Sequence, residues 1–209
     1  MRTYALNFPP IPGPIPLDRL SDGDRAELRK LAAGKSSIIE IGTFLGGSAE
    51  TMLEASDAHM VCVDTFRGTA GNETAEVKRS VSLQYTLMRL DRFPGRVSVM
   101  VADSLSAARM IGDGTADLIF LDADHSYDAV KADIAAWRPK LKPGGVFAGH
   151  DMYKWHADVP PERMEAVKHL QADPETGIHC GVHLAVTESF DNIELLGGVD
   201  SSVWCARSA

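Results

Sequence analysis

Short apolar runs alternate along the chain with polar or glycine-rich turns and with amphipathic stretches. The runs are rich in β-branched residues and almost continuously apolar, which is typical of strands that are buried on both faces of a sheet. We expect strands at Ser37 to Ile41, Met60 to Val63, Val97 to Val101, Leu118 to Leu121 and Val146 to Ala148.

The amphipathic stretches predict helices that cover both faces of this sheet. In the clearest example, Tyr127 to Trp137, apolar side chains recur every three or four residues along one stripe. An earlier helix begins after Ser21, a favourable N-cap residue, and stops at Gly34. The other expected helices are Ser48 to Ala55, Glu73 to Leu90 and Ser104 to Ile111.

Strands that alternate with helices predict a doubly wound, parallel α/β sheet. The carboxyl-terminal part of the chain differs, because two apolar runs, Val182 to Thr187 and Ser202 to Ala206, are joined through Gly197 and Gly198 without a helix-length insert. Strands connected in this way are antiparallel. We therefore expect a single, mostly parallel seven-stranded sheet with an antiparallel edge strand.

The chain has 209 residues and a mass of 22.6 kDa, which suits one domain and leaves no room for a separate substrate domain. Five of its eleven prolines lie between Asn7 and Pro16, where they exclude a helix or a central strand. We expect a proline-rich arm over residues 1–20 and the domain over residues 21–209. The arm either lies on the surface, covers a substrate pocket or crosses to a partner subunit of a homo-oligomer.

Charge and composition narrow the partners. A net charge of −8 would repel a phosphate backbone, so we expect a small cationic or neutral substrate and no nucleic acid. No apolar run approaches the roughly 18 residues of a spanning helix, and the first residues lack a signal-peptide core, so we expect a cytoplasmic protein without membrane contact. The cysteines, at positions 62, 180 and 205, have no Cys-x-x-Cys spacing and are expected to be small buried side chains.

The first strand runs into a turn that contains Gly42, Gly46 and Gly47 and leads into a helix. Glycine allows a ligand to approach the backbone closely, and the start of the helix presents free N–H groups. Asp64 ends the second strand 22 residues after Gly42, close to the offset of roughly 20 residues at which an acid binds ribose hydroxyls. The pattern favours a bound nucleoside over a glycine turn without a ligand.

The turn reads Glu-x-Gly-x-x-x-Gly and lacks the second glycine of a dinucleotide-binding Gly-x-Gly-x-x-Gly turn. It resembles the first motif of class I S-adenosylmethionine-dependent methyltransferases, which have a Rossmann-like fold. The resemblance continues in order to Asp151, and within the family it is closest to small-molecule O-methyltransferases that act on sugar and antibiotic hydroxyls. It is carried by Val61-Cys62-Val63-Asp64, Val101-Ala102-Asp103-Ser104, Asp117 to Asp122 and Lys140 to Val146.

The resemblance implies a cofactor role for particular residues. Gly42 and Gly46 would line the methionine part of S-adenosylmethionine, and Asp64 would bind the ribose. Asp103 and the Ser104 backbone would meet the adenine, although Asp103 can also cap the next helix. The remaining residues of the expected cofactor site are Glu40, Ser48 and Asp122.

Glu40 has two explanations at this point. Its carboxylate could bind the ammonium group of the cofactor through water. It could equally be a buried, hydrogen-bonded carboxylate that orders the glycine turn.

Polar residues also follow the fourth and fifth strands, at Asp122 to Tyr127 and Gly149 to Met152. Adjacent parallel strands lie about 4.8 Å apart, so side chains at both carboxyl ends can converge on one ion or hydroxyl. Catechol-type relatives bind magnesium here, which implies Asp122 and Asp151 as metal ligands. His150 stands where that pattern has an oxygen ligand, and magnesium prefers oxygen.

His150 therefore either selects a softer ion, acts as a general base towards the substrate hydroxyl, or is structural. His125 either takes part in catalysis or bonds across the strand ends. His179, Cys180 and His183, at the edge of an expected strand, are interpreted as packing and surface residues.

We thus expect an S-adenosylmethionine-dependent O-methyltransferase with catalytic residues His125, His150 and Asp151 and a small-molecule hydroxyl acceptor. A non-catalytic nucleoside-binding protein on the same fold is the alternative. A nicotinamide-dependent oxidoreductase is disfavoured by the glycine spacing. Acceptor specificity is expected from the arm, from the segment Phe66 to Phe93 or from the loop Met152 to Pro161.

Overall fold

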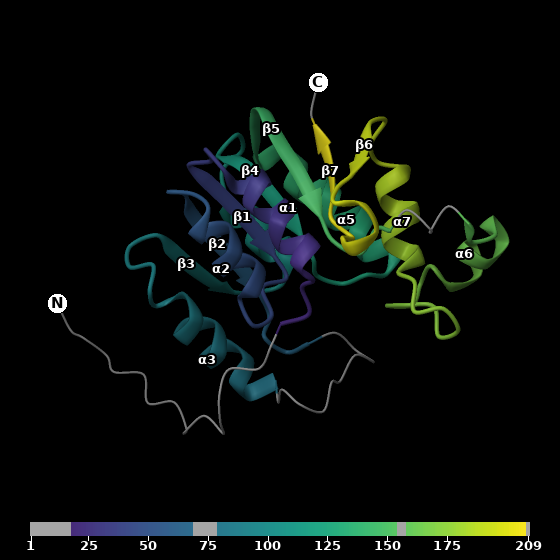
Figure 1. Ribbon diagram of the computed structural model, residues 1–209, viewed down its shortest axis with the longest axis horizontal. Coiled ribbons are helices and arrows are strands. Elements are labelled where there is room, and N and C mark those ends of the chain that lie inside the picture. The colour runs from purple at the N-terminus through teal and green to yellow at the C-terminus, as the bar shows by residue number, and fades with distance from the viewer. Residues whose placement is uncertain (1–17, 69–78, 154–157, 208–209) are drawn as a thin grey trace.

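A computed structural model describes residues 18–68, 79–153 and 158–207 (Figure 1). Seven strands form one sheet in the order β3-β2-β1-β4-β5-β7-β6. Strands β1 to β5 are parallel, and β7 is antiparallel to both of its neighbours. The sheet confirms the predicted class, with the antiparallel strand one place in from the edge. The strands are β1 (Ser37–Ile41), β2 (His59–Asp64), β3 (Val97–Val101), β4 (Ala116–Leu121), β5 (Leu141–Gly149), β6 (Ile193–Leu195) and β7 (Trp204–Arg207).

Helices cover both faces of the sheet, as Figure 1 shows. On one face, α1 and α2 bury Leu28, Met52 and Leu53 against the strands. On the other face, α4, α5 and α7 pack around Ile134 and Trp137. The helices are α1 (Asp22–Ala32), α2 (Gly47–Glu54), α3 (Arg79–Leu90), α4 (Ser104–Met110), α5 (Tyr127–Trp137), α6 (Pro161–Val167) and α7 (Cys180–Thr187), with short 3-10 turns at Arg138–Lys140 and Gly198–Asp200.

The start of α1 has the predicted cap. The Ser21 hydroxyl accepts a hydrogen bond from the Asp24 backbone, and the Asp24 carboxylate accepts one from the Ser21 backbone. This reciprocal pair satisfies donors that the first turn of a helix leaves unbonded. Asp24 is almost fully buried, and its other oxygen accepts a hydrogen bond from the Ser202 backbone. This bond helps to compensate the carboxylate for the loss of water.

The prediction of a strand at Val182 to Thr187 is wrong, because this segment forms most of α7. Its branched side chains suggested a strand, yet the buried residues Val182, Ala185 and Val186 recur at helical spacing. Packing of that stripe against α5 outweighs the weak local preference. The antiparallel pair does exist across Gly197 and Gly198, but its first member is β6.

Helix α3 starts at Arg79, and residues 69–78, which include the predicted first part of this helix, lie outside the described residues. The same holds for residues 1–17, so the arm stays a prediction, as does its role in a homo-oligomer. All three cysteines are buried, as predicted. Within the described ranges, no helix is long and apolar enough to cross a membrane.

Among the residues that the structure describes, three other than glycine have a positive φ: Phe44, Phe66 and Asp151. Each lies just after the carboxyl end of a parallel strand, at β1, β2 and β5 respectively. Backbone strain of this kind costs on the order of 1–3 kcal/mol and is tolerated where the surroundings hold it in place, which is often at functional sites. The strained positions therefore mark the edge of the sheet at which ligands bind in open α/β folds.

Candidate functional site

The glycine turn is tied to the neighbouring strand end by backbone packing. Gly42 has a φ of +90°, and a side chain there would overlap the carbonyl group of Asp122. Its N–H donates a 2.8 Å hydrogen bond to the Val63 carbonyl. Gly42 thus brings the ends of β1, β2 and β4 together, which places the turn directly beside the polar residues after β4.

Gly46 has a φ of +76° and precedes the first residue of α2. The next residue, Gly47, lies against the carboxylate of Asp18, so a side chain there would collide with it. Asp18 also pairs with Arg25 and, at 3.2 Å, with Arg89. The positive φ of Gly46 and the close approach of Asp18 to Gly47 therefore favour glycine at both positions. The predicted contact of Gly42 and Gly46 with the methionine part of the cofactor stays a prediction.

Asp64 orders the two turns around it. Its Oδ2 accepts a 2.7 Å hydrogen bond from the Phe44 backbone, and its Oδ1 accepts a 2.6 Å bond from the Phe66 backbone. The carboxylate thereby holds in place two of the strained residues at the sheet edge. Its predicted role in binding ribose would use lone pairs that these two bonds leave free.

Asp103 caps α4, since its side chain accepts a 2.8 Å hydrogen bond from the Ser106 backbone. The Ser104 side chain points inward: its hydroxyl donates to Asp133 and accepts a 2.8 Å bond from Trp137 Nε1. Burial raises the pKa of Asp133 to about 6. The Ser104 side chain thus connects α4 to α5. These bonds do not use the Ser104 backbone, whose contact with adenine stays a prediction.

Glu40 is fully buried in the middle of the sheet, beneath the glycine turn. The Ser48 hydroxyl donates a hydrogen bond to its Oε1, while its Oε2 has no hydrogen-bond partner among the described residues. Burial, together with the negative charges of Asp122 and Asp64, raises the pKa of Glu40 to about 8. The bond from Ser48 supports a part in ordering the turn, and the unpartnered oxygen leaves room for a further donor such as a water or an ammonium group.

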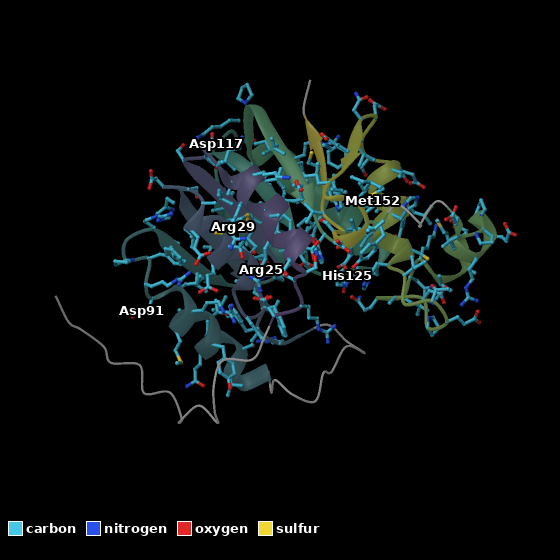
Figure 2. All side chains as sticks on the ribbon, viewed as in Figure 1. Arg25, Arg29, Asp91, Asp117, His125 and Met152 are labelled. Atoms are coloured by element: carbon cyan, nitrogen blue, oxygen red, sulfur yellow. The ribbon has the colours of Figure 1, made fainter. Side chains whose placement is uncertain are left out.

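The predicted convergence of side chains at the ends of β4 and β5 is present. His125 Nε2 lies 2.8 Å from Asp151 Oδ2 and 3.4 Å from Asp122 Oδ1, and Asp151 Oδ1 lies 3.3 Å from His150 Nδ1. Figure 2 shows His125 where the sheet meets the segment that carries α6 and α7. Asp122, His125 and His150 also line a small pocket. The structure therefore gathers Asp122, His125, His150 and Asp151 into one cluster beside the glycine turn.

Charge compensation dominates the electrostatics of this cluster. Burial alone would lower the pKa of His125, but the carboxylates of Asp122 and Asp151 outweigh it and raise that pKa to about 10. The same balance raises the pKa of His150 well above its usual value. Burial would raise the pKa of Asp151, yet the two histidines hold it well below its usual range.

The cluster also contains two residues that the sequence analysis did not assign to it. Asp24, from α1, places Oδ2 3.3 Å from His150 Nε2. His179, just before α7, places Nε2 3.5 Å from Asp151 Oδ1, and its ring centroid lies 4.4 Å from that of His125. His179 is interpreted from the sequence as a packing or surface residue because a strand is expected in this segment. The helical spacing of Val182, Ala185 and Val186 is the signal that would have placed His179 just before a helix instead.

The ligand set implied for magnesium is altered in this chain. Asp122, His150 and Asp151 offer ligand atoms within 4.8 Å of one another, and so do His125, Asp151 and His179. Each set contains imidazole, whereas magnesium is bound almost entirely through oxygen. The donors present do not fit magnesium, and they resemble sets that suit transition metals.

Residues 39–152 match the family described as Methyltransferase domain. The chain is 31% identical over 122 residues to an uncharacterized protein, y4gI, of Sinorhizobium fredii, and the match covers 54% of this chain but 13% of that protein. A Klebsiella pneumoniae protein provisionally assigned as an O-methyltransferase has a similar structure, with a TM-score of 0.63, 16% identity, and coverage of 93% of this chain and 84% of that one.

A Staphylococcus aureus protein provisionally assigned as a caffeoyl-CoA O-methyltransferase is also similar, with a TM-score of 0.58, 16% identity, and coverage of 88% and 80%. At such identities the likeness concerns the fold alone. The family match spans more than half of the 209 residues and runs from β1 to the residue after Asp151. The chain belongs to this methyltransferase-domain family and has the class I, S-adenosylmethionine-dependent methyltransferase fold.

Proposed function

We propose that the protein transfers the methyl group of S-adenosylmethionine to a hydroxyl oxygen of a small polar molecule, such as a sugar or another natural product. The observation that carries this proposal is the cluster of Asp122, His125, His150 and Asp151 at the ends of β4 and β5. It lies beside the glycine turn, whose residue Gly42 packs on the Asp122 backbone. Groups able to handle a proton are thus placed next to the expected cofactor site.

The chemistry asks little of the protein beyond alignment. The sulfonium methyl carbon is electrophilic, so the acceptor oxygen displaces the sulfur in line and S-adenosylhomocysteine leaves. Holding donor and acceptor in that geometry is the larger contribution to the rate. The hydroxyl proton must leave the oxygen as the new bond forms, and a positioned base typically contributes about 10²-fold to 10⁴-fold.

His150 is the proposed base. Its Nδ1 lies 3.3 Å from Asp151 and its Nε2 lies 3.3 Å from Asp24, so two carboxylates orient the ring and stabilise its imidazolium form. Because they also raise the pKa of His150, the unprotonated form that can accept the hydroxyl proton increases with pH, and we expect kcat to rise with pH. The His150 backbone carbonyl accepts a 3.1 Å hydrogen bond from Trp204 Nε1, which fixes the end of β5. Magnesium does not fit the donor set, so the proposal uses no magnesium-dependent step.

The expected partners follow from charge. A net charge of −8 supports a cationic or neutral acceptor and disfavours nucleic acid. The cytoplasmic location, the absence of membrane contact and the homo-oligomer remain part of the proposal and rest on the sequence alone.

Methyl transfer from labelled S-adenosylmethionine to a panel of hydroxylated small molecules tests the function. We expect turnover with at least one acceptor, and we expect His150→Ala to lower kcat by about 10²-fold or more with unchanged affinity for S-adenosylhomocysteine. His59→Ala, on the exposed surface of β2, is the matched control and should keep full activity.

Two results would count against the proposal. Tight binding of S-adenosylhomocysteine without transfer to any acceptor would favour a non-catalytic nucleoside-binding protein. Loss of cofactor affinity in His150→Ala to the same degree as loss of turnover would make His150 a structural residue.

A further inference from the structure

Gln171 contacts both histidines on the α7 side of the cluster. Its side-chain Oε1 lies 3.2 Å from His125 Nδ1, and its backbone carbonyl lies 2.6 Å from His179 Nδ1. The amide nitrogen of Gln171 donates a 2.8 Å hydrogen bond to Asp124, which fixes the oxygen of the amide towards His125. That oxygen also accepts a 3.1 Å bond from the His125 backbone.

These contacts determine which nitrogen of each ring carries a proton. An amide oxygen and a backbone carbonyl can only accept, so Nδ1 is the donor in both His125 and His179. In the neutral form of each ring, the lone pair then lies on Nε2. Both Nε2 atoms face Asp151, at 2.8 Å and 3.5 Å from its two oxygens.

We propose that His125, Asp151 and His179 bind a divalent first-row transition-metal ion, such as Mn²⁺, Co²⁺ or Zn²⁺, in preference to Mg²⁺. Two imidazoles and one carboxylate make a donor set that such ions favour. Histidines that bind metal almost always donate their second ring nitrogen to an oxygen, as both do here to Gln171. The three ligand atoms lie within 4.8 Å of one another, so one ion can contact all three.

The site is mostly buried and keeps a limited exposure to solvent. The side chains of His125, Asp151 and His179 are 14%, 12% and 21% exposed. The proposal concerns binding by the chain itself and does not require the acceptor of methyl transfer to be a hydroxyl.

The other set, Asp122, His150 and Asp151, is less suited to a transition-metal ion, because only one of its three ligands is an imidazole. Both nitrogens of His150 face carboxylates, Asp24 on one side and Asp151 on the other, at 3.3 Å each. Asp24 lies outside the set and can hold Nε2 as a donor while Nδ1 faces Asp151, so this set also has an oriented histidine. The number of imidazoles is what favours His125, Asp151 and His179 for a transition metal. Asp151 is shared, so it would connect the metal site to the proposed base.

The alternative is a cluster that holds no metal, in which the two histidines pair with Asp151 alone. Titration of the chelator-treated full chain with Mn²⁺, Co²⁺, Zn²⁺ and Mg²⁺ separates the two. We expect one ion to bind per chain, at least about 10-fold tighter for the transition metals than for Mg²⁺, and a ligand-field absorption spectrum with Co²⁺.

Variants locate the ion. His179→Ala and Gln171→Leu should each weaken Co²⁺ binding by about 10-fold or more, since loss of a partner that orients a ligand typically costs 10-fold to 100-fold. Gln171→Leu keeps all three ligands, so its effect reports on orientation of His125. His169→Ala, an exposed histidine of the same segment, is the control and should bind normally. Thermal unfolding of each variant checks that it is folded.

Four results would overturn the proposal. They are no binding of any transition metal, equal affinity for Mg²⁺, equal binding by His179→Ala and His169→Ala, and Co²⁺ binding that survives Gln171→Leu unchanged. The metal titrations contain neither S-adenosylmethionine nor an acceptor. Their outcome therefore does not depend on whether the protein transfers a methyl group.

Discussion

Single residues in this protein serve both the fold and the site. Asp151 has a positive φ of 65° and contacts three histidines, and its backbone N–H donates a 3.2 Å hydrogen bond to the Ser202 hydroxyl. Asp24 caps α1 and pairs with His150. The carboxylates of Asp151 and Asp24 are stabilised because the tertiary structure brings histidines close to them.

Glu40 provides a pH-dependent prediction. Its pKa is about 8 in the folded protein, against 4.5 in a free side chain, because burial penalises the charged form. Between these pH values the folded state binds a proton that the unfolded state has lost, so the free energy of unfolding falls as pH rises through this window. We expect Glu40→Gln to remove this dependence, which amounts to at most about 1.4 kcal/mol per pH unit.

Urea unfolding at pH 5, 6.5 and 8 measures this effect. The wild type should lose stability relative to Glu40→Gln as pH rises. Glu54→Gln, which changes an exposed glutamate of α2, is the control and should follow the wild type. Parallel curves for wild type and Glu40→Gln would contradict a raised pKa at Glu40.

At the scale of elements, α7 holds part of the site in place. A side chain at Gly181 would meet the carbonyls of His125 and Lys168 and the Tyr127 backbone. The helix can therefore approach the loop between β4 and α5 only because this residue is glycine. Close approach is what brings His179 to Asp151.

Gly181→Ala should separate α7 from that loop. We expect a loss of about 1–3 kcal/mol in the free energy of unfolding, the usual cost of overpacking. We also expect weaker binding of Co²⁺, measured by titration, because His179 moves with the helix. Gly112→Ala, where an added carbon meets Thr115 at an ordinary 3.6 Å, is the control. Stability equal to that of the control would contradict the tight contact seen at Gly181.

At the scale of the whole molecule, one edge of the sheet carries the residues of the proposed site. The glycine turn, Asp64 and the histidine cluster all lie at the carboxyl ends of parallel strands. Two separate cores on opposite faces of the sheet support this edge. The single sheet thus supports both cores and the proposed ligand site.

Cofactor binding should therefore stabilise the entire fold. A ligand that binds only the folded state at 100 times its Kd adds about 2.7 kcal/mol to the free energy of unfolding. We expect S-adenosylhomocysteine to raise Tm and NAD to leave it unchanged. Asp64→Asn should reduce the rise, since the ribose contact loses its charge, whereas Asp57→Asn, near the opposite end of β2, should not. A rise with NAD alone would contradict the assignment of the cofactor.

The sequence by itself determined the local features of this protein. Apolar periodicity located β1 to β5, α5 and the Ser21 cap, and glycine spacing with Asp64 indicated the type of cofactor site. It also predicted that Asp122, His125, His150 and Asp151 converge. These conclusions depend on residues close together in the chain, or on the rule that parallel strands end at one edge.

Only the tertiary structure decided how distant segments complete the site. Residues 180–187 form a helix because their buried stripe packs on α5, and this packing outweighs the strand preference of their branched side chains. Asp24, Gln171 and His179 come from segments far from both strand ends, so their contacts with the cluster could not be read from spacing. The physical reason is that burial and electrostatic pairing depend on distance in space, and the sequence records distance along the chain alone.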